Sequence, residues 1–325
     1  MTENLASKYR NNLPQLSDRL FLTDSGLETM LIFHEGYELH QFASFELMKT
    51  ESGRRRLLDY YRQHAQTAVD ARMGFVLESP TWRSNADWGA KLGYSPEALA
   101  ELNRQSIGLM VQVRGELETP DSPMPISGNV GPLGDGYAAS KMSADDSERL
   151  HTPQIRTFAE TQADMVSAFT MTSTQEAIGV TRAAVKAEMP VAVSFTVETD
   201  GRLPTGQTLK EAIETVDAAT NAAPAYYMIN CAHPTHFEQA LKANEAWIKR
   251  VRGIRANASR RSHAELDEAK DLDDGDPVEL GRQYRELRRT FGQFNVLGGC
   301  CGTDHRHVEQ ICFACSDVAG RHAAE

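Results

Sequence analysis

Short apolar runs alternate with longer amphipathic segments along most of this chain. Strands are predicted at residues 20–24, 74–78, 124–129, 165–170, 190–195, 225–230, 252–257 and 294–298. Helical periodicity appears between them, for example at residues 54–71, 96–116, 176–186 and 208–219. This alternation is typical of βαβ units around a parallel sheet. Eight strands in 325 residues favour a single-domain α/β fold, a (β/α)₈ TIM barrel. No G-x-G-x-x-G follows a predicted strand, so a dinucleotide-binding sheet has no support.

Two segments interrupt this pattern. Residues 1–18 are polar and are predicted to form a leader that precedes the barrel domain at 19–325. Residues 259–277 are acidic and contain glycine and aspartate, and they are predicted to form an insertion after the seventh strand. The insertion lacks the ligand spacing of an EF-hand, which favours a solvated loop over a calcium site.

Composition narrows the classes of function. The chain is 41% hydrophobic and 24% charged, which is ordinary for a globular protein with a large core. A net charge of −11 argues against a nucleic-acid partner. There is no apolar run long enough for a membrane span and no signal-peptide core. The five cysteines do not resemble a secreted disulfide framework, so we expect a cytoplasmic protein, with a homo-oligomer left open.

Three of the cysteines carry the strongest chemical signal. Cys231 follows the sixth predicted strand, and Cys300 and Cys301 follow the eighth. Adjacent cysteines make a poor disulfide, because neighbouring Cα atoms lie about 3.8 Å apart and an unstrained bridge needs roughly 4.4 Å. As thiolates they are good zinc ligands. Since the carboxyl ends of barrel strands meet on the catalytic face, we expect all three thiols to lie there together.

Three protein ligands leave one tetrahedral position of zinc open, which is typical of a catalytic site. The sequence therefore predicts an enzyme that uses Zn²⁺ to activate a thiol. The alternatives are buried thiols or a closed zinc site, a zinc-dependent barrel hydrolase, and a non-catalytic zinc or redox sensor. His305 and His307 are predicted on the terminal helix and not as ligands. Cys312 and Cys315 are predicted to be partly buried thiols on that helix.

Several motifs resemble those of the homocysteine S-methyltransferase family. The strongest are residues 229–231 (INC) and 298–303 (GGCCGT), which match the zinc-ligand motifs of that family. Weaker matches are residues 24–29 (DSGLET), 128–132 (GNVGP) and 192–195 (AVSF). The resemblance implies a TIM barrel and Zn²⁺ held by Cys231, Cys300 and Cys301. It also implies methyl transfer from a sulfonium or betaine-type donor to homocysteine, giving methionine, so the partners are a small-molecule thiol acceptor and a methyl donor.

The chain departs from the family pattern at positions that concern the acceptor. Ser25 stands where the family usually has a second glycine. Phe169 stands where the family has an acidic residue that helps to hold homocysteine, and a phenyl ring cannot pair with an ammonium group. Glu78 is a candidate to restore a carboxylate from a neighbouring strand. A different thiol acceptor is therefore the alternative to homocysteine.

The remaining candidates follow from position on the predicted catalytic face. Asp24 is expected to bind an amino group, and Glu28 either shares that role or begins the first helix. Trp82, Trp88 and Tyr137 are either packing residues or a cage for a cationic donor. Asn129 and Gly131 belong to a tight loop after the third strand. The predicted substrate residues are Asp24, Gly26, Glu28, Glu78, Trp82, Asn129, Phe169 and Asn230.

Overall fold

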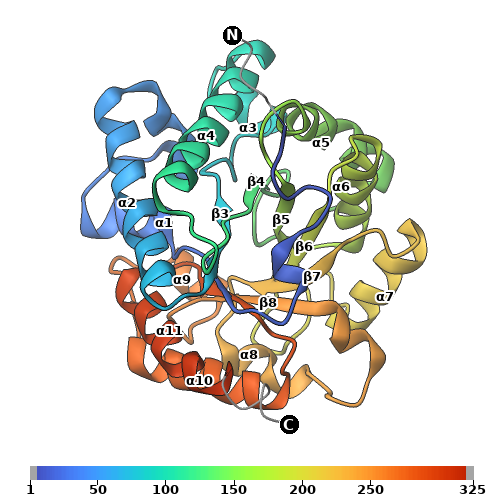
Figure 1. Cartoon of the computed structure of the whole chain (residues 1–325). Coiled ribbons are helices and arrows are strands. Elements are labelled where there is room, and N and C mark those ends of the chain that lie inside the picture. Colours follow the sequence, from blue (N-terminus) through green and yellow to red (C-terminus); the bar gives the residue numbers. More distant parts are fainter. Residues whose placement is uncertain (1–5, 320–325) are drawn as a thin grey trace.

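The computed structural model describes residues 6–319, and within them a parallel β-barrel forms the centre of the molecule (Figure 1). The strands are hydrogen-bonded in the order β2-β1-β9-β8-β7-β6-β5-β4-β3. Only Val76 separates β2 from β3, and these two pieces pair with β1 and β4, so one segment closes the barrel. The predicted (β/α)₈ barrel is confirmed. The strands are β1 (Phe21–Leu22), β2 (Gly74–Phe75), β3 (Leu77–Glu78), β4 (Ile126–Val130), β5 (Met165–Met171), β6 (Val191–Phe195), β7 (Tyr226–Asn230), β8 (Val251–Ala256) and β9 (Val296–Gly299).

Long helices surround the barrel (Figure 1). They are α2 (Glu51–Asp70), α4 (Pro96–Leu117), α5 (Ala144–Ala159), α6 (Thr174–Lys186), α7 (Leu209–Thr220), α10 (Pro277–Thr290) and α11 (His305–Ala319). Several begin at a serine or threonine whose hydroxyl accepts a first-turn N–H, as Thr50, Ser95, Ser143, Ser173 and Thr208 do. No helix within residues 6–319 is long and apolar enough to cross a membrane.

Short helical turns line the loops between these elements. The α-helical ones are α1 (Leu27–Thr29), α3 (Ala86–Lys91), α8 (Pro234–Phe237) and α9 (His263–Asp267). Within residues 6–319 there are also five 3₁₀ turns and one π turn, at Pro14–Leu16, His40–Phe42, Ser44–Lys49, Glu238–Ala240, Ala246–Arg250 and, for the π turn, Met30–His34.

Side chains along each strand point alternately into the barrel and toward the helices, and this alternation divides the core into two parts. On β5, Met165 and Phe169 belong to the cluster inside the barrel, whereas Val166 and Ala168 pack in the larger cluster between sheet and helices. Successive side chains of a strand point to opposite faces, so each strand contributes to both. The inward position nearest the carboxyl end of each strand therefore faces the mouth of the barrel.

The segment before β1, predicted as a polar leader, covers the opposite end of the barrel from residue 6 onward. Leu13 joins the inner cluster that contains Phe21 and Met165, and Gln15 is fully buried. The Arg10 guanidinium donates to the carbonyls of residues 159, 161 and 163. These contacts tie the segment to the amino-terminal ends of the strands.

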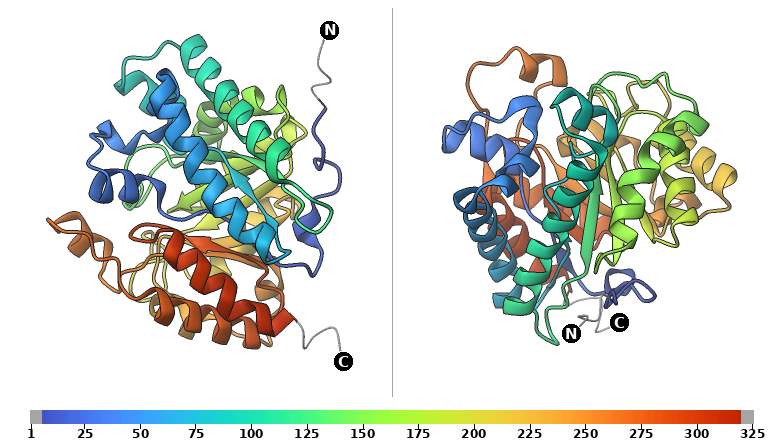
Figure 2. Two further views of the ribbon diagram at one scale, coloured as in Figure 1. Left: turned by 60° about the vertical axis from the view of Figure 1, so that its left-hand side comes forward. Right: turned by 90° about the horizontal axis from the view of Figure 1, so that it is seen from above.

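The segment between β8 and α10 contains α9 and covers the predicted insertion at 259–277. It projects from the body of the barrel on the side of the loops that follow the strands (Figure 2, in orange). Where this segment returns to the barrel, it contacts His307, which is fully buried. The Nε2 of His307 lies 2.8 Å from the Asp274 carbonyl oxygen.

Candidate active site and metal centre

The three cysteines lie together at the carboxyl ends of the strands. Cys231 follows β7, and Cys300 and Cys301 follow β9. One sulfur from each residue lies within 4.8 Å of the others, and the trio is the one group of potential metal ligands found among residues 6–319. The expectation that distant positions converge on one face is met.

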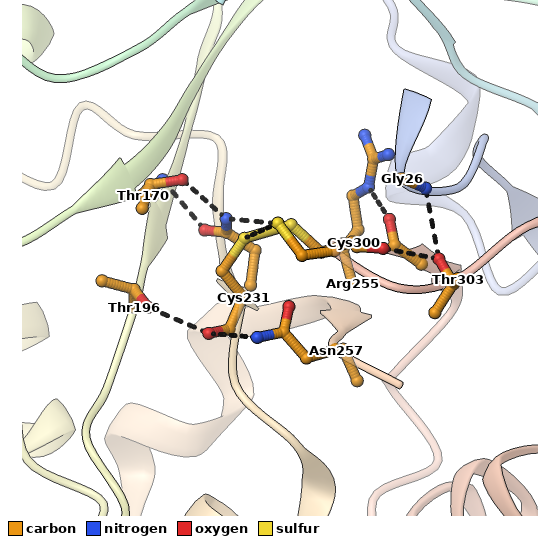
Figure 3. The surroundings of a disulfide bond; sticks show 12 residues. Gly26, Thr170, Thr196, Cys231, Arg255, Asn257, Cys300 and Thr303 are labelled. Carbon is orange, nitrogen blue, oxygen red and sulfur yellow. Dashed lines mark hydrogen bonds between the residues drawn. A yellow bond between two sulfur atoms is a disulfide. The ribbon is translucent and has the colours of Figure 1, made fainter. Parts of the chain in front are cut away.

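Cys231 and Cys300 are joined by a disulfide across β7 and β9 (Figure 3), whereas Cys301 is a free thiol. The adjacent pair is not bridged, as the Cα spacing predicts. The bridge between strands was not predicted, because sequence spacing does not show how close two strand ends lie. The thiolate is the form of cysteine that binds metals, so Cys231 and Cys300 can hold a metal only after this bond is reduced.

The remaining geometry fits a thiolate metal site. The sulfurs of Cys231 and Cys301 are 3.9 Å apart, and two ligands of a tetrahedral zinc with arms of ~2.3 Å would be about 3.8 Å apart. The Tyr137 hydroxyl lies 3.6 Å from both sulfurs. Burial raises the pKa of the Cys301 thiol, so a bound cation would be needed to stabilise its thiolate.

Asn230 positions the backbone on which the sulfurs sit. Its Oδ1 accepts from the Thr170 N–H at 2.9 Å and from Ser194 Oγ at 2.6 Å, and its Nδ2 donates to Thr170 Oγ1. Thr170 and Cys231 have φ values of 60° and 51°, in the left-handed region that residues other than glycine rarely occupy. Asn230 therefore links the ends of β5, β6 and β7 beside Cys300, whose sulfur is 4.0 Å from Nδ2.

Gly26 allows the loop after β1 to pack closely against the loop after β9, which carries Cys300 and Cys301. Its N–H lies 3.1 Å from the Thr303 carbonyl and 3.2 Å from Thr303 Oγ1. A Cβ at this position would lie 2.4 Å from the Cys300 carbonyl oxygen. The role of Gly26 in the structure is therefore close backbone approach.

Arg255, which the sequence reasoning missed, lies between Asp24 and Glu78. We call these three residues the pocket floor. The Nη2 of Arg255 lies 2.8 Å from Asp24 Oδ1, and its Nη1 forms a very short contact with Glu78. All three side chains are at least nine-tenths buried. Two carboxylates and one guanidinium leave a formal charge of −1. Glu78, the candidate to replace the family's acidic residue, is paired with the protein's own cation, as Asp24 is.

Phe169 packs inside the barrel with the Arg255 guanidinium 5.1 Å from its ring centroid. Both residues occupy inward positions near the carboxyl ends of their strands, as do Glu78, Asn129 and Asn230. Arg255 could have been found from the sequence by this parity, because Ile254 and Ala256 on either side of it are apolar and pack toward the helices.

Other acidic and polar candidates lie at the edge of the floor. The Tyr60 hydroxyl lies 3.1 Å from Asp24 Oδ2, and Ser25 Oγ lies 2.9 Å from His64 Nε2. Burial raises the pKa of Glu28, whose Oε1 accepts a hydrogen bond from Ser44. The Asn129 Oδ1 is buried and has no hydrogen-bond partner within residues 6–319.

The aromatic candidates are arranged differently from a simple cage. The Arg83 guanidinium lies 4.0 Å from the Trp82 ring centroid and 4.1 Å from that of Trp88. One cation of the protein is therefore already stacked on both rings. Tyr137 instead packs against His263, with ring centroids 4.2 Å apart. Arg83 was missed because an arginine in a loop is ordinarily exposed.

The last helix, α11, carries the two histidines and the two cysteines that the sequence places there. His307 is buried beside Asp304 and takes part in holding the 259–277 segment, and neither it nor His305 belongs to the cysteine group. Cys312 and Cys315 are free, buried thiols, with Cys312 Sγ 3.9 Å from the Met73 sulfur.

The three cysteines, the residues of the floor and the aromatic candidates surround a cavity of about 630 Å³. Every predicted metal and substrate residue lines it: Asp24, Gly26, Glu28, Glu78, Trp82, Asn129, Phe169, Asn230, Cys231, Cys300 and Cys301. Its volume lies in the range of small-molecule sites. The arrangement has three sulfurs, an acidic floor and a stacked guanidinium within one pocket.

Comparison with known proteins agrees with this geometry. Residues 21–315 match the family model for homocysteine S-methyltransferase. Among solved structures, the chain is similar to the oxidized form of the homocysteine methyltransferase MmuM from Escherichia coli, with a TM-score of 0.74, 16% identity, and coverage of 92% of this chain and 97% of that one. The metallated form of the same protein gives a TM-score of 0.69 at 16% identity, with coverage of 93% and 98%. At this identity the structures show the shared fold, and the family match covers nearly the whole chain. The chain therefore belongs to the homocysteine S-methyltransferase family and is a thiol S-methyltransferase.

Proposed function

We propose that this protein transfers a methyl group from a cationic sulfonium or betaine-type donor to homocysteine, with Zn²⁺ held by Cys231, Cys300 and Cys301. The observation that carries the proposal is the convergence of three cysteine sulfurs within 4.8 Å in a substrate-sized cavity. Zinc bound there would lower the pKa of the acceptor thiol and so supply a nucleophilic sulfur at neutral pH. We propose a cytoplasmic location, because the cysteine pattern is not that of a secreted protein.

The chain's own residues orient the acceptor beside the sulfurs. Asp24 Oδ1 is buried without a hydrogen bond, although it pairs with Arg255, and it faces the cavity. An ammonium group bound there would compensate the net negative floor. Asn230 holds the loop that carries Cys231, so it acts through position and not through substrate contact.

The test is a methyl-transfer assay on reduced, zinc-loaded protein. Homocysteine and a panel of other thiols are combined with S-methylmethionine, S-adenosylmethionine and betaine, while bound zinc is measured in the same samples. Methionine formation is expected with at least one donor. Cys301→Ser is expected to lower both bound zinc and turnover at least tenfold, because each thiolate contributes directly to the site.

Cys312→Ser is the matched control, since it removes a buried thiol outside the trio. It is expected to keep wild-type zinc content and turnover. Transfer that survives in Cys301→Ser without bound zinc would contradict the metal-dependent mechanism.

A different thiol acceptor is the second candidate, and Phe169 favours it. The phenyl ring sits where the family has an acidic residue, and Glu78 is occupied by Arg255. Turnover with another thiol and none with homocysteine would identify this alternative. The same assay therefore separates the two acceptors.

A further inference from the structure

Arg83 is a buried cation without a carboxylate partner among the described residues. Its side chain is 8% exposed. Its one acceptor within residues 6–319 is the Gly134 carbonyl, 3.1 Å from Nη1. Burying a charge is costly unless it is paired and fully hydrogen-bonded. The Arg83 guanidinium therefore has hydrogen-bond donors that the described part of the chain leaves unused.

The other buried arginines are better satisfied. Arg114 pairs with Asp164 at 2.9 Å, and Arg255 pairs with Asp24 and Glu78. Arg288 donates to two backbone carbonyls, those of residues 294 and 315. Arg83 differs from all three in having one acceptor, and it lines the cavity that also contains the cysteines.

The free edge of Arg83 has the shape of a carboxylate-binding fork. Because Nη1 is used by Gly134, the N–H groups of Nε and Nη2 have no acceptor in the described part of the chain. These two nitrogens form the side-on pair that binds a carboxylate through two parallel hydrogen bonds. The guanidinium carbon also lies 4.0 Å and 4.1 Å from the ring centroids of Trp82 and Trp88, within the range of cation–π contact.

The fork and the cysteine sulfurs border the same cavity, and one loop contacts both. A Cβ on Gly136 would be 3.8 Å from Arg83 Nη2, so the loop at residue 136 passes directly beside the fork. The next residue, Tyr137, places its hydroxyl 3.6 Å from the sulfurs of Cys231 and Cys301. The Tyr137 side chain therefore extends from the loop beside Arg83 to the cysteine sulfurs.

We propose that Arg83 binds the carboxylate of a zwitterionic small-molecule substrate in this cavity and is a specificity-determining residue. The acidic floor around Asp24 suits the cationic end of such a molecule, and Arg83 suits its anionic end. The inference rests on the proposed function in one respect, that the ligand is either the methyl donor or the thiol acceptor. Both carry the same chemical group, so the experiment separates them.

The test measures binding and not turnover. Reduced, zinc-loaded full-length protein is titrated calorimetrically with betaine and betaine amide, with S-methylmethionine and its carboxamide, and with homocysteine and homocysteinamide. Wild type is expected to prefer the carboxylate member of at least one pair. Arg83→Met is expected to weaken binding of that member about 10- to 100-fold, the usual effect of losing hydrogen bonds to a charged group, and to change the amide less than about threefold.

Lys91→Met is the matched control. Lys91 also lies over the Trp88 ring, at 4.1 Å, but its side chain is about half exposed and pairs with Asp87 at 2.8 Å. It is expected to leave the carboxylate preference unchanged. Arg83→Lys keeps the charge without the fork and is expected to give an intermediate loss, which preserves the test if Arg83→Met does not fold.

A preference in a donor pair assigns the carboxylate to the donor, and a preference in the homocysteine pair assigns it to the acceptor. The inference is overturned if no pair shows a preference in wild type, or if Arg83→Met retains it. Failure of the proposed function gives a different result. Zinc binding or methyl transfer is then absent, while the Arg83-dependent preference for the carboxylate ligand persists.

Discussion

At the scale of single residues, Arg255 determines the charge of the pocket floor. It lies between Asp24 and Glu78, and it also donates to the Gly299 carbonyl from Nε at 2.9 Å. This one guanidinium therefore links β1, β3, β8 and β9 below the cysteines. Removing one member of a buried ion network leaves the others unpaired, which is more costly than losing an exposed pair.

Arg255→Met is expected to lower the free energy of unfolding by about 3 kcal/mol or more, because two buried carboxylates lose their cation. Urea unfolding near neutral pH measures the loss. The double variant Arg255→Met/Glu78→Gln is expected to recover part of it, since one of the stranded charges is then absent. Arg104 lies on the surface, with its side chain 44% exposed and paired with Glu160 at 3.3 Å, and Arg104→Met is expected to change stability by less than about 0.5 kcal/mol. Equal effects of Arg255→Met and Arg104→Met would refute the network.

At the scale of secondary-structure elements, the loops after β1 and β9 are held together by small residues. Gly26 passes against the Cys300 carbonyl, and Gly298 and Gly299 leave room for Thr23 and Thr303. A side chain at position 26 or 298 would separate the loop that carries Asp24 from the loop that carries Cys300 and Cys301, and one at position 299 would displace Thr303. The site therefore depends on contact between backbones as well as on its ligands.

Gly26→Ala is expected to cost about 1–3 kcal/mol, as overpacking does, because the new Cβ would meet the Cys300 carbonyl at 2.4 Å and Thr29 Oγ1 at 2.6 Å. Gly108→Ala provides the opposite case on the exposed face of α4, where no atom lies within 4 Å of the added Cβ. It is expected to stabilise the protein by roughly 0.5–1 kcal/mol, since alanine loses less entropy in a helix. Thermal unfolding of both variants tests the pair, and the same sign for both would contradict the packing argument.

At the scale of the whole molecule, the segment before β1 closes one end of the barrel, and the cavity with the three cysteines lies at the other. Tyr9 donates its N–H to Asp164 at 2.6 Å, and Arg252 donates to the Gln15 carbonyl. The segment therefore contributes to stability at a distance from the chemistry. Changes in it are expected to affect unfolding more than zinc binding.

Arg10→Ala is expected to destabilise the protein by about 2 kcal/mol, because carbonyls of residues 159, 161 and 163 lose a charged donor. Urea unfolding measures the loss, and zinc stoichiometry of the reduced protein is measured alongside. Unchanged zinc content is expected. A loss of zinc with no loss of stability would show that this segment acts on the site and not on the barrel.

The fold could be predicted closely because periodicity reports burial directly. All eight predicted strands correspond to strands of the structure, with β2 and β3 as two pieces of one segment. The convergence of the cysteines also followed, since barrel topology brings strand ends together. The partners of Glu78 could not be predicted, because its neighbour Arg255 lies 177 positions away. The Arg83 stack was missed for a related reason: a loop arginine shows no sign of burial until its surroundings are known.

The sequence alone determined the barrel, the family and the convergence of the three cysteines, because strand periodicity and short motifs are local properties of the chain. Only the tertiary structure decided which charges meet. Arg255 neutralises part of the acidic floor, while Arg83 is enclosed by two tryptophans with its fork unpaired. Those outcomes depend on distances between elements far apart in the chain, and electrostatic interactions follow distance and burial in space, whatever the spacing in sequence.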